Sequence, residues 1–130
     1  MSDNIRVRSV VGRFLEHSRI YYFANGGADE LYIGSADMMH RNLDRRVEVL
    51  VRVDSSELKK RLTGIIDLAL TDTQGSWKLG KSGKWSRITS AKDAAAGRLL
   101  SRNGSAPHEL NGDVPLSLQK ELMRHASQTQ

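Results

Sequence analysis

A short strand pattern followed at once by a long helical pattern is the feature that most constrains the fold. Residues 47–53, VEVLVRV, carry valine at every second position, while Glu48 and Arg52 share a face. Asp54 and the glutamate three residues later form a D-x-x-E capping box, which predicts a helix through about Asp72. The apolar stripe of that helix would be Leu58, Leu62, Ile65, Ile66 and Ala69. Strand and helix in direct succession predict a layered fold of both element types.

A β-hairpin is predicted ahead of this strand. RIYYFAN (19–25) and LYIGS (31–35) are strand-like, and GGADE between them places a turn at Gly26 and Gly27. Residues 5–16 carry apolar side chains at helical spacing, which favours a helix, with a short strand followed by a helix as the alternative. The fold class that follows is α/β (α+β), a mixed sheet flanked by helices.

The last third of the chain changes character. Residues 90–113 are small and polar, which predicts loops with at most one short set of helical turns. Residues 117–126, SLQKELMRHA, place leucines at helical spacing, and we expect a terminal amphipathic helix that packs back on the body.

One motif suggests a nucleotide site and fails on its context. GSWKLGKS, residues 75–82, matches the phosphate-loop pattern G-x-x-x-x-G-K-[ST] at Gly75, Gly80, Lys81 and Ser82. The pattern works only when a strand enters the loop and a helix leaves it, because a helix N-terminus must face the phosphates. Here a helix precedes the loop and strand-like KWSRI follows it, so we predict a hairpin turn with no role for Lys81.

Charge points to a polyanionic partner. The chain has 130 residues, a formal charge of +5 and a pI near 9.8. Every Lys or Arg before Lys59 is arginine, whose planar fork suits phosphate, although chance and codon bias explain this equally well. There is no cysteine, no apolar run that could span a bilayer and no signal-peptide pattern. We expect a cytoplasmic protein and leave attachment at the membrane periphery open.

The candidate site lies in residues 12–49. His17 and Arg19 come just before the first hairpin strand, and Gly34 with Ser35 ends the second. A histidine, a cation and a small hydroxyl residue at one sheet edge suit phosphoryl chemistry, although a histidine at an element end often has only a structural role. RNLDRR follows, and as a helical turn it would place Arg41 with Arg45 on one face and Asn42 with Arg46 on the next. His40, His108 and His125 show no metal-ligand pattern.

Two of these segments resemble a known family. SDNIRVRSVVGRFLEHSRIYYFANGG and LYIGSADMM-RNLDRRVEV are similar to the C-terminal catalytic region of bacterial polyphosphate kinase, which reversibly moves the terminal phosphate of ATP onto inorganic polyphosphate. The likeness runs from about Ser2 to Asp72, is looser to Ile88 and returns at ELMRHA. It implies a phospholipase-D-like half-domain over residues 1–90, a variable loop over 91–115, and a closing helix and tail over 116–130.

The resemblance also assigns roles. The family joins two half-domains, each with a histidine, and His17 matches the histidine of the second, which contacts the ATP phosphates and assists the leaving group. It implies ATP or polyphosphate binding by His17, Arg19, Ser35, Arg41, Asn42, Arg46 and Glu48. Of these, Arg41 and Asn42 are supported by proximity alone. The phosphorylated histidine and the Mg²⁺-binding residues would lie upstream.

The departures from the phospholipase D pattern H-x-K-x-x-x-x-D favour the kinase branch. Arg19 replaces the lysine, Ala24 replaces the aspartate, and Asp37 stands where asparagine is usual. By resemblance we expect ATP, ADP, polyphosphate, an upstream catalytic half-domain and a homo-oligomer as partners, with Mg²⁺ and ATP as cofactors and this chain inactive alone. The alternatives are a phosphodiesterase or nuclease of the phospholipase D class and a non-catalytic polyanion-binding module.

Overall fold

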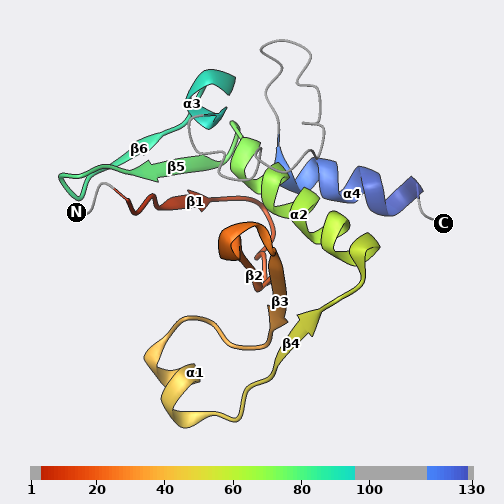
Figure 1. The fold of residues 1–130 in the computed structure, drawn as a ribbon. Coiled ribbons are helices and arrows are strands. Elements are labelled where there is room, and N and C mark those ends of the chain that lie inside the picture. Colours follow the sequence, from red (N-terminus) through yellow and green to blue (C-terminus); the bar gives the residue numbers. More distant parts are fainter. Residues whose placement is uncertain (1–3, 96–116, 129–130) are drawn as a thin grey trace. The chain divides into compact units, whose positions relative to one another are not determined.

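The computed structural model describes residues 4–95 and 117–128. The chain divides into two compact units: Glu16–Gly64, and a second unit formed by the chain before and after that segment. Both helices and strands are present, so the predicted fold class is confirmed (Figure 1). In place of the single mixed sheet that we expected, the strands form two three-stranded sheets with antiparallel pairing throughout. No helix among the described residues is long and apolar enough to cross a membrane.

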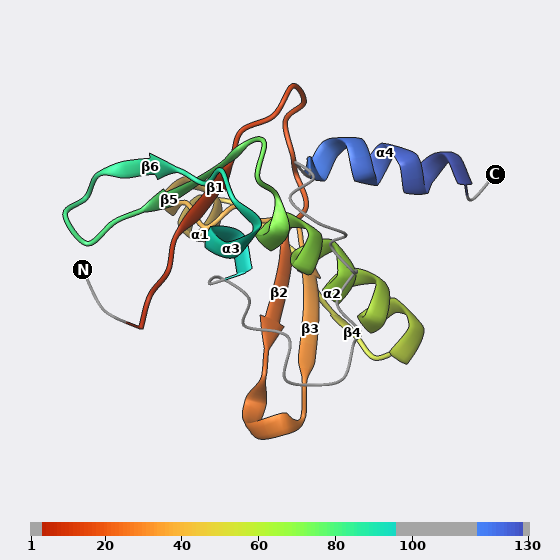
Figure 2. The same cartoon turned by 90° about the horizontal axis from the view of Figure 1, so that it is seen from above.

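The unit Glu16–Gly64 is built on the predicted hairpin. Strands β2 (Ile20–Phe23) and β3 (Glu30–Gly34) pair antiparallel, and β4 (Leu50–Val53) pairs antiparallel with the other side of β3. The connection between β2 and β3 is a single 3₁₀ turn, Asn25–Gly27, in which both glycines have positive φ. Figure 2 shows the two strands side by side and closed by this turn. The helix α1 (His40–Arg45) lies between β3 and β4 in sequence.

The strand predicted over residues 47–53 is shorter in the structure. Ser35 interrupts the ladder, because its backbone N–H donates to Val49 O at 3.0 Å while its hydroxyl accepts from Val49 N at 2.9 Å. Pairing therefore begins at Leu50, and Glu48 lies outside the strand. The prediction that Glu48 and Arg52 share a strand face is wrong, and Arg52 pairs with Asp54 at 3.1 Å.

The predicted long helix is present as α2 (Ser56–Thr71), but it is capped one residue later than expected. Leu58 N donates to Ser55 Oγ at 3.4 Å and Lys59 N donates to Ser55 O at 2.9 Å. The Asp54 capping box is therefore wrong. Ser55 directly precedes the first residue of the helix, and Asp54 instead pairs with Arg52. Leu68 is the buried apolar side chain of the helix, while Leu58 of the predicted stripe is exposed.

The second unit corrects the N-terminal prediction. Residues 5–16 form no helix. They contain β1 (Arg8–Val10), which pairs with β5 (Ser76–Leu79), and β5 pairs with β6 (Trp85–Arg87) (Figure 1). The strand half of the alternative is thus correct and its helix is absent. Backbone pairing across a long sequence separation overrides the local helical spacing.

The phosphate-loop lookalike is a hairpin, as predicted. Gly80 N donates to Lys84 O at 2.9 Å, and Gly83 adopts a φ of 79° in the turn between β5 and β6. Gly75 has a different reason to be glycine. The chain passes so close to Val11 here that a Cβ at position 75 would lie 2.3 Å from Val11 O. This distance is too short for any side chain.

The C-terminal helix is confirmed as α4 (Leu118–Gln128), and a buried carboxylate anchors it. Asp72 is 2% exposed, and it accepts from Leu118 N and from Gly75 N, each at 2.7 Å. The short helix α3 (Ala91–Ala95) lies within the predicted loop region, most of which is outside the described residues. Arg8 donates to Leu70 O and Ala94 O, so its guanidinium links β1 to the backbone of α2 and α3.

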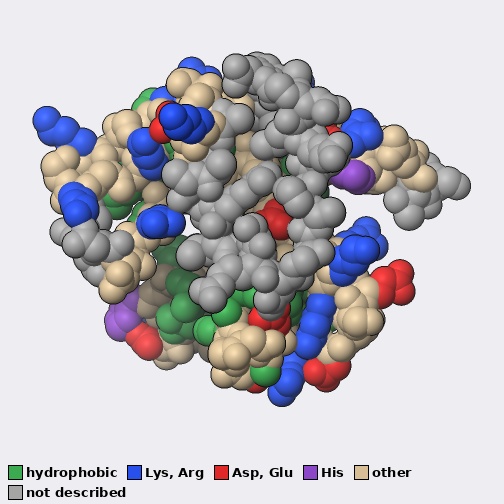
Figure 3. All heavy atoms as spheres, turned by 45° about the horizontal axis from the view of Figure 1, so that its top comes forward, with side chains coloured by type: hydrophobic (Ala, Val, Ile, Leu, Met, Phe, Trp, Pro, Cys, Tyr) green, Lys and Arg blue, Asp and Glu red, His purple; other side chains and the backbone are tan. Residues whose placement is uncertain are grey.

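The apolar interior of each unit is small. Leu31 and Val53 are buried in the unit Glu16–Gly64, and Ile88 and Leu118 are buried in the other. Many large apolar side chains instead reach the surface, as the hydrophobic atoms in Figure 3 show. Val47, fully exposed, is the extreme case.

Candidate functional site

The sheet β2-β3-β4 brings three separate chain segments to one of its ends. In its register Ile20 faces Ile33 and Gly34 faces Leu50, so the start of β2, the end of β3 and the start of β4 coincide. Backbone bonds extend this closure beyond the strands, because Gly34 N donates to Arg19 O at 3.0 Å. The side chains around residues 17–19, 35–37 and 46–49 therefore gather at one sheet end.

Gly34 permits this tight closure. A Cβ there would lie 3.1 Å from the Tyr21 ring and 3.2 Å from Leu50 Cδ1, closer than side chains normally approach. The Tyr21 ring packs next to Gly34, and the Tyr21 hydroxyl donates a hydrogen bond to Ala36 O at 3.0 Å. A glycine and a tyrosine therefore fix the loop that carries Ser35.

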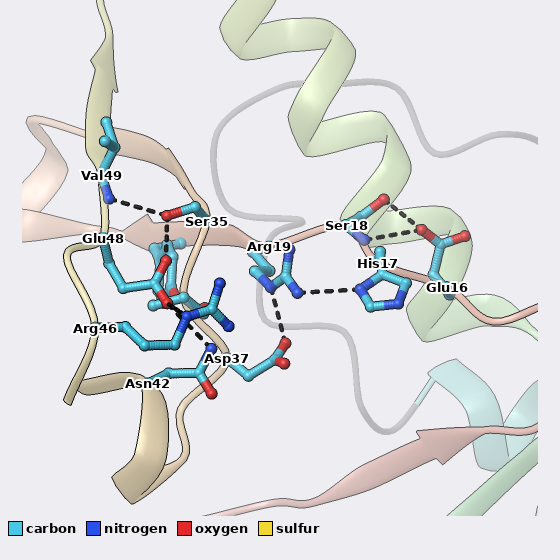
Figure 4. A network of polar contacts seen from close by, with 12 residues as sticks. Glu16, His17, Ser18, Arg19, Ser35, Asp37, Asn42, Arg46, Glu48 and Val49 are labelled. Atoms are coloured by element: carbon cyan, nitrogen blue, oxygen red, sulfur yellow. Dashed lines mark hydrogen bonds and ion pairs between the residues drawn. The ribbon is translucent and has the colours of Figure 1, made fainter. Parts of the chain in front are cut away.

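Glu48 is the centre of the first group of polar side chains. One of its carboxylate oxygens accepts the Ser35 hydroxyl, and the other lies 3.2 Å from Asn42 Nδ2 and 3.4 Å from Arg46 Nε (Figure 4). The Ser35 hydrogen bond, followed by the charge of Arg46 and the Asn42 amide, holds the pKa of Glu48 below its usual range. Glu48 is therefore an ionised acceptor at neutral pH.

Exposure divides this group into an inner and an outer part. The side chain of Glu48 is 13% exposed and Asn42 is 1% exposed, whereas the Arg46 side chain is 60% exposed. The carboxylate of Glu48 and the amide of Asn42 are thus held inside the protein, whereas the side chain of Arg46 is largely exposed to solvent.

Arg19 is the centre of the second group. Its Nε donates to Asp37 Oδ1 at 2.8 Å, and its Nη2 lies 3.0 Å from His17 Nδ1 (Figure 4). The Asp37 hydrogen bond raises the pKa of Arg19, and the reciprocal bond lowers the pKa of Asp37. A guanidinium can only donate, so His17 Nδ1 is the acceptor and the imidazole proton is on Nε2. His17 thus presents an N–H group.

Helix α1 and the residue that follows it, Arg46, supply the remaining predicted residues. Arg41 is exposed, and its charge contributes to lowering the pKa of Asp37. Asn42 and Arg46 both contact Glu48, but the predicted helical face does not join them, because α1 ends at Arg45 and Arg46 has extended backbone. Arg45, the third arginine of the run, is exposed.

None of the polar contacts of these two groups described above involves another histidine. His40 pairs with Asp44 one turn along α1, His125 is on α4, and His108 lies outside the described residues. Among residues 4–95 and 117–128, no three His, Cys, Asp or Glu side chains gather in a way that could hold a metal ion.

The groups around Glu48 and Arg19 together form one polar cluster at the sheet end. The sequence analysis missed two residues that belong to it or hold it in place. Asp37 was noted only as a departure from a motif, and Tyr21 only as a strand residue. A signal existed for Asp37, since it follows Ser35 by two positions and strand pairing brings that loop opposite Arg19. No sequence signal indicated that the Tyr21 hydroxyl would bind the same loop.

In fold, the chain is similar to a kinase of known structure. The crystal structure of polyphosphate kinase from Porphyromonas gingivalis superimposes with a TM-score of 0.74 and 28% identity, over 98% of this chain and 16% of that one. The family model described as polyphosphate kinase C-terminal domain 2 matches residues 1–98. The chain therefore belongs to the polyphosphate kinase family, which confirms the resemblance.

Related protein sequences support the same family assignment. The polyphosphate kinase of Streptomyces coelicolor is 53% identical over 93 residues, which are 72% of this chain and 12% of that protein. The polyphosphate kinase of Pseudomonas aeruginosa is 49% identical over 89 residues, which are 68% of this chain and 13% of the relative. The chain thus spans about an eighth of the length of these relatives.

Proposed function

We propose that this chain supplies the ATP-side half of the active site of an ATP-polyphosphate phosphotransferase. Residues 1–90 would belong to the second, phospholipase-D-like half-domain, 91–115 to a variable loop, and 116–130 to the closing helix and tail. Family membership supports the reaction class, and the clustering of basic, histidine and hydroxyl side chains at one sheet end supports phosphate as the ligand.

The state of His17 carries the proposal. Its only lone pair in the neutral ring, on Nδ1, accepts from Arg19, which leaves Nε2–H as the free group. In phosphoryl transfer the bond from the γ-phosphorus to the bridging oxygen breaks, a bond to the nucleophile forms, and ADP leaves with the negative charge. An Nε2–H donor suits the leaving oxygen, where charge develops. It does not suit the nucleophile, which needs a free lone pair.

The cations around His17 would bind the remaining phosphate oxygens. Arg46 and Arg41 project into solvent, and Arg19 uses Nε and Nη2 internally, which leaves Nη1 for a ligand. Glu48, with Asn42 and Ser35, would hold Arg46 in place. A preoriented guanidinium loses less conformational entropy on binding than a free one.

ATP and Mg²⁺ differ in how well the described residues fit them. Cationic and N–H donors fit the phosphates of ATP or polyphosphate. The carboxylates do not fit Mg²⁺, because Asp37 is bound by Arg19, Glu48 is bound by Ser35, and no cluster of three potential ligands exists among the described residues. We assign no step of this chain to the metal. An upstream half-domain would supply the phosphorylated histidine, and a homo-oligomer in the cytoplasm or at the membrane periphery remains part of the proposal.

Binding of inorganic polyphosphate tests the proposal. His17→Ala should weaken binding by roughly tenfold, the effect of one hydrogen bond to a charged oxygen. His40→Ala is the matched control, since His40 lies in the same unit and pairs only with Asp44 among the described residues. Salt-dependent binding that His17→Ala leaves unchanged would indicate a non-catalytic polyanion-binding module instead. Hydrolysis of a simple phosphodiester would indicate the phospholipase D alternative.

A further inference from the structure

We propose that Asp37 is a positioning residue that acts through Arg19 to hold His17 in the tautomer with its proton on Nε2. The consequence for catalysis rests on the proposed function, whereas the tautomer itself is a property of this chain. Asp37 thereby determines that His17 presents a hydrogen-bond donor and no free lone pair.

The rigid plane of the guanidinium connects the two ends of this chain of contacts. Arg19 Nε donates to Asp37 Oδ1 at 2.8 Å, and Nη2 of the same group lies 3.0 Å from His17 Nδ1. Since the five N–H donors of arginine have a fixed geometry, fixing Nε also fixes the direction of Nη2. The backbone of Arg19 is held as well, because its carbonyl accepts from Gly34 N at 3.0 Å.

The carboxylate end is also anchored. Asp37 O accepts from Met39 N at 2.7 Å, and the preceding Ala36 O accepts the Tyr21 hydroxyl at 3.0 Å. The side chains of Arg19 and Asp37 are 23% and 37% exposed, so their pair is partly shielded from water. The Arg19 hydrogen bond keeps the pKa of Asp37 below its usual range, and the carboxylate stays charged at neutral pH.

His40 provides a contrast within the same unit. Its Nδ1 pairs with the Asp44 carboxylate, which can only accept, so Nδ1 of His40 carries the proton and Nε2 keeps the lone pair. Both His17 and His40 are exposed. The structure therefore predicts two accessible histidines in opposite states, one without and one with a free nitrogen lone pair.

Diethyl pyrocarbonate distinguishes the two states, because it acylates a nitrogen lone pair of neutral imidazole. At about pH 8, above the ordinary imidazole pKa, trypsin digestion and mass spectrometry follow each histidine separately, since His17 lies in peptide 14–19 and His40 in peptide 20–41. We expect His17 in the unaltered chain to react at least roughly tenfold more slowly than His40, the effect of one charge-assisted hydrogen bond. Equal rates would overturn the proposal without any variant.

Substitutions then test Asp37 itself. Asp37→Ala should raise the His17 rate roughly tenfold and leave His40 unchanged, whereas Asp37→Asn keeps an Oδ1 acceptor and should stay within about threefold of the unaltered chain. Asp54→Ala, which removes a carboxylate from another arginine of the unit, should change neither rate. An unchanged His17 rate in Asp37→Ala, or an Asn variant as reactive as the Ala variant, would overturn the proposal.

This readout needs no phosphate ligand. Slow His17 acylation together with absent polyphosphate binding would therefore contradict the proposed function and leave the role of Asp37 intact. Polyphosphate binding together with fast His17 acylation would contradict the role of Asp37 alone.

Discussion

At the scale of single residues, the cluster combines inner groups that orient and outer groups that remain accessible. Glu48 and Asp37 each form an ion pair with an arginine, and the Arg46 side chain is the more exposed of the two arginine partners. Because the carboxylates compensate part of the positive charge, the phosphate binding that we propose does not rest on net charge alone. Orientation of individual N–H groups must contribute to any affinity for phosphate.

Arg46 gives the sharpest test of that view. Arg46→Ala should weaken polyphosphate binding by roughly 1–3 kcal/mol if the charge-assisted contact is made. Arg46→Lys should recover only part of the loss, because an ammonium group cannot reproduce the guanidinium fork. Titration of polyphosphate into the three proteins measures both effects.

Arg61 on α2 provides the control for charge. Arg61→Ala removes the same positive charge from an exposed position in the same unit, and it should have much less effect than Arg46→Ala. Equal losses for the two variants, or full recovery by lysine at position 46, would reduce the site to general electrostatics.

The residues of the cluster differ in how far the sequence could predict them. Arg46 and Asn42 both contact Glu48, but helical spacing is not the reason, because Arg46 follows the end of α1 in extended backbone. The strand pattern suggested a different partner for Glu48, because alternation says which residues share a face but not where a ladder ends. The Ser35 hydroxyl ends this ladder, through a contact between segments that are distant in sequence.

At the scale of elements, local patterns predicted the hairpins and helices well. The β2-β3 hairpin, α2 and α4 each follow from turn residues or apolar spacing within the element. β1 could not be predicted in this way, because its backbone pairs with β5, where Arg8 faces Lys78. Residues 5–16 have helical spacing, but Arg8–Val10 form a strand because they pair with β5.

The β5-β6 hairpin allows a test of whether the phosphate-loop lookalike binds a ligand. Lys81 lies in the turn between β5 and β6, so the chain leaves this turn as a strand and not as the helix that a phosphate loop requires. Lys81→Ala should leave ATP and polyphosphate binding unchanged within error, in contrast to Arg46→Ala measured in parallel. A tenfold or larger loss, about 1.4 kcal/mol, would show that the phosphate-loop motif takes part after all.

At the scale of the whole molecule, the chain corresponds to a small part of its relatives. It spans 12–13% of the length of the Streptomyces and Pseudomonas proteins, and it carries exposed apolar residues such as Val47 and Leu50. Exposed apolar side chains of this kind are typical of surfaces that are covered in a larger assembly. The proposed function accordingly assigns the phosphorylated histidine to residues outside these 130.

The central claim is that His17 assists transfer and is not itself phosphorylated. Incubation of the purified 130-residue chain with γ-labelled ATP and Mg²⁺ tests it most directly, with a full-length polyphosphate kinase as the positive control. The account predicts no acid-labile, base-stable label on this chain, because the lone pair of His17 Nδ1 accepts from Arg19. Label that appears on the chain and disappears in His17→Ala would contradict the account, since it would show that His17 is the nucleophile.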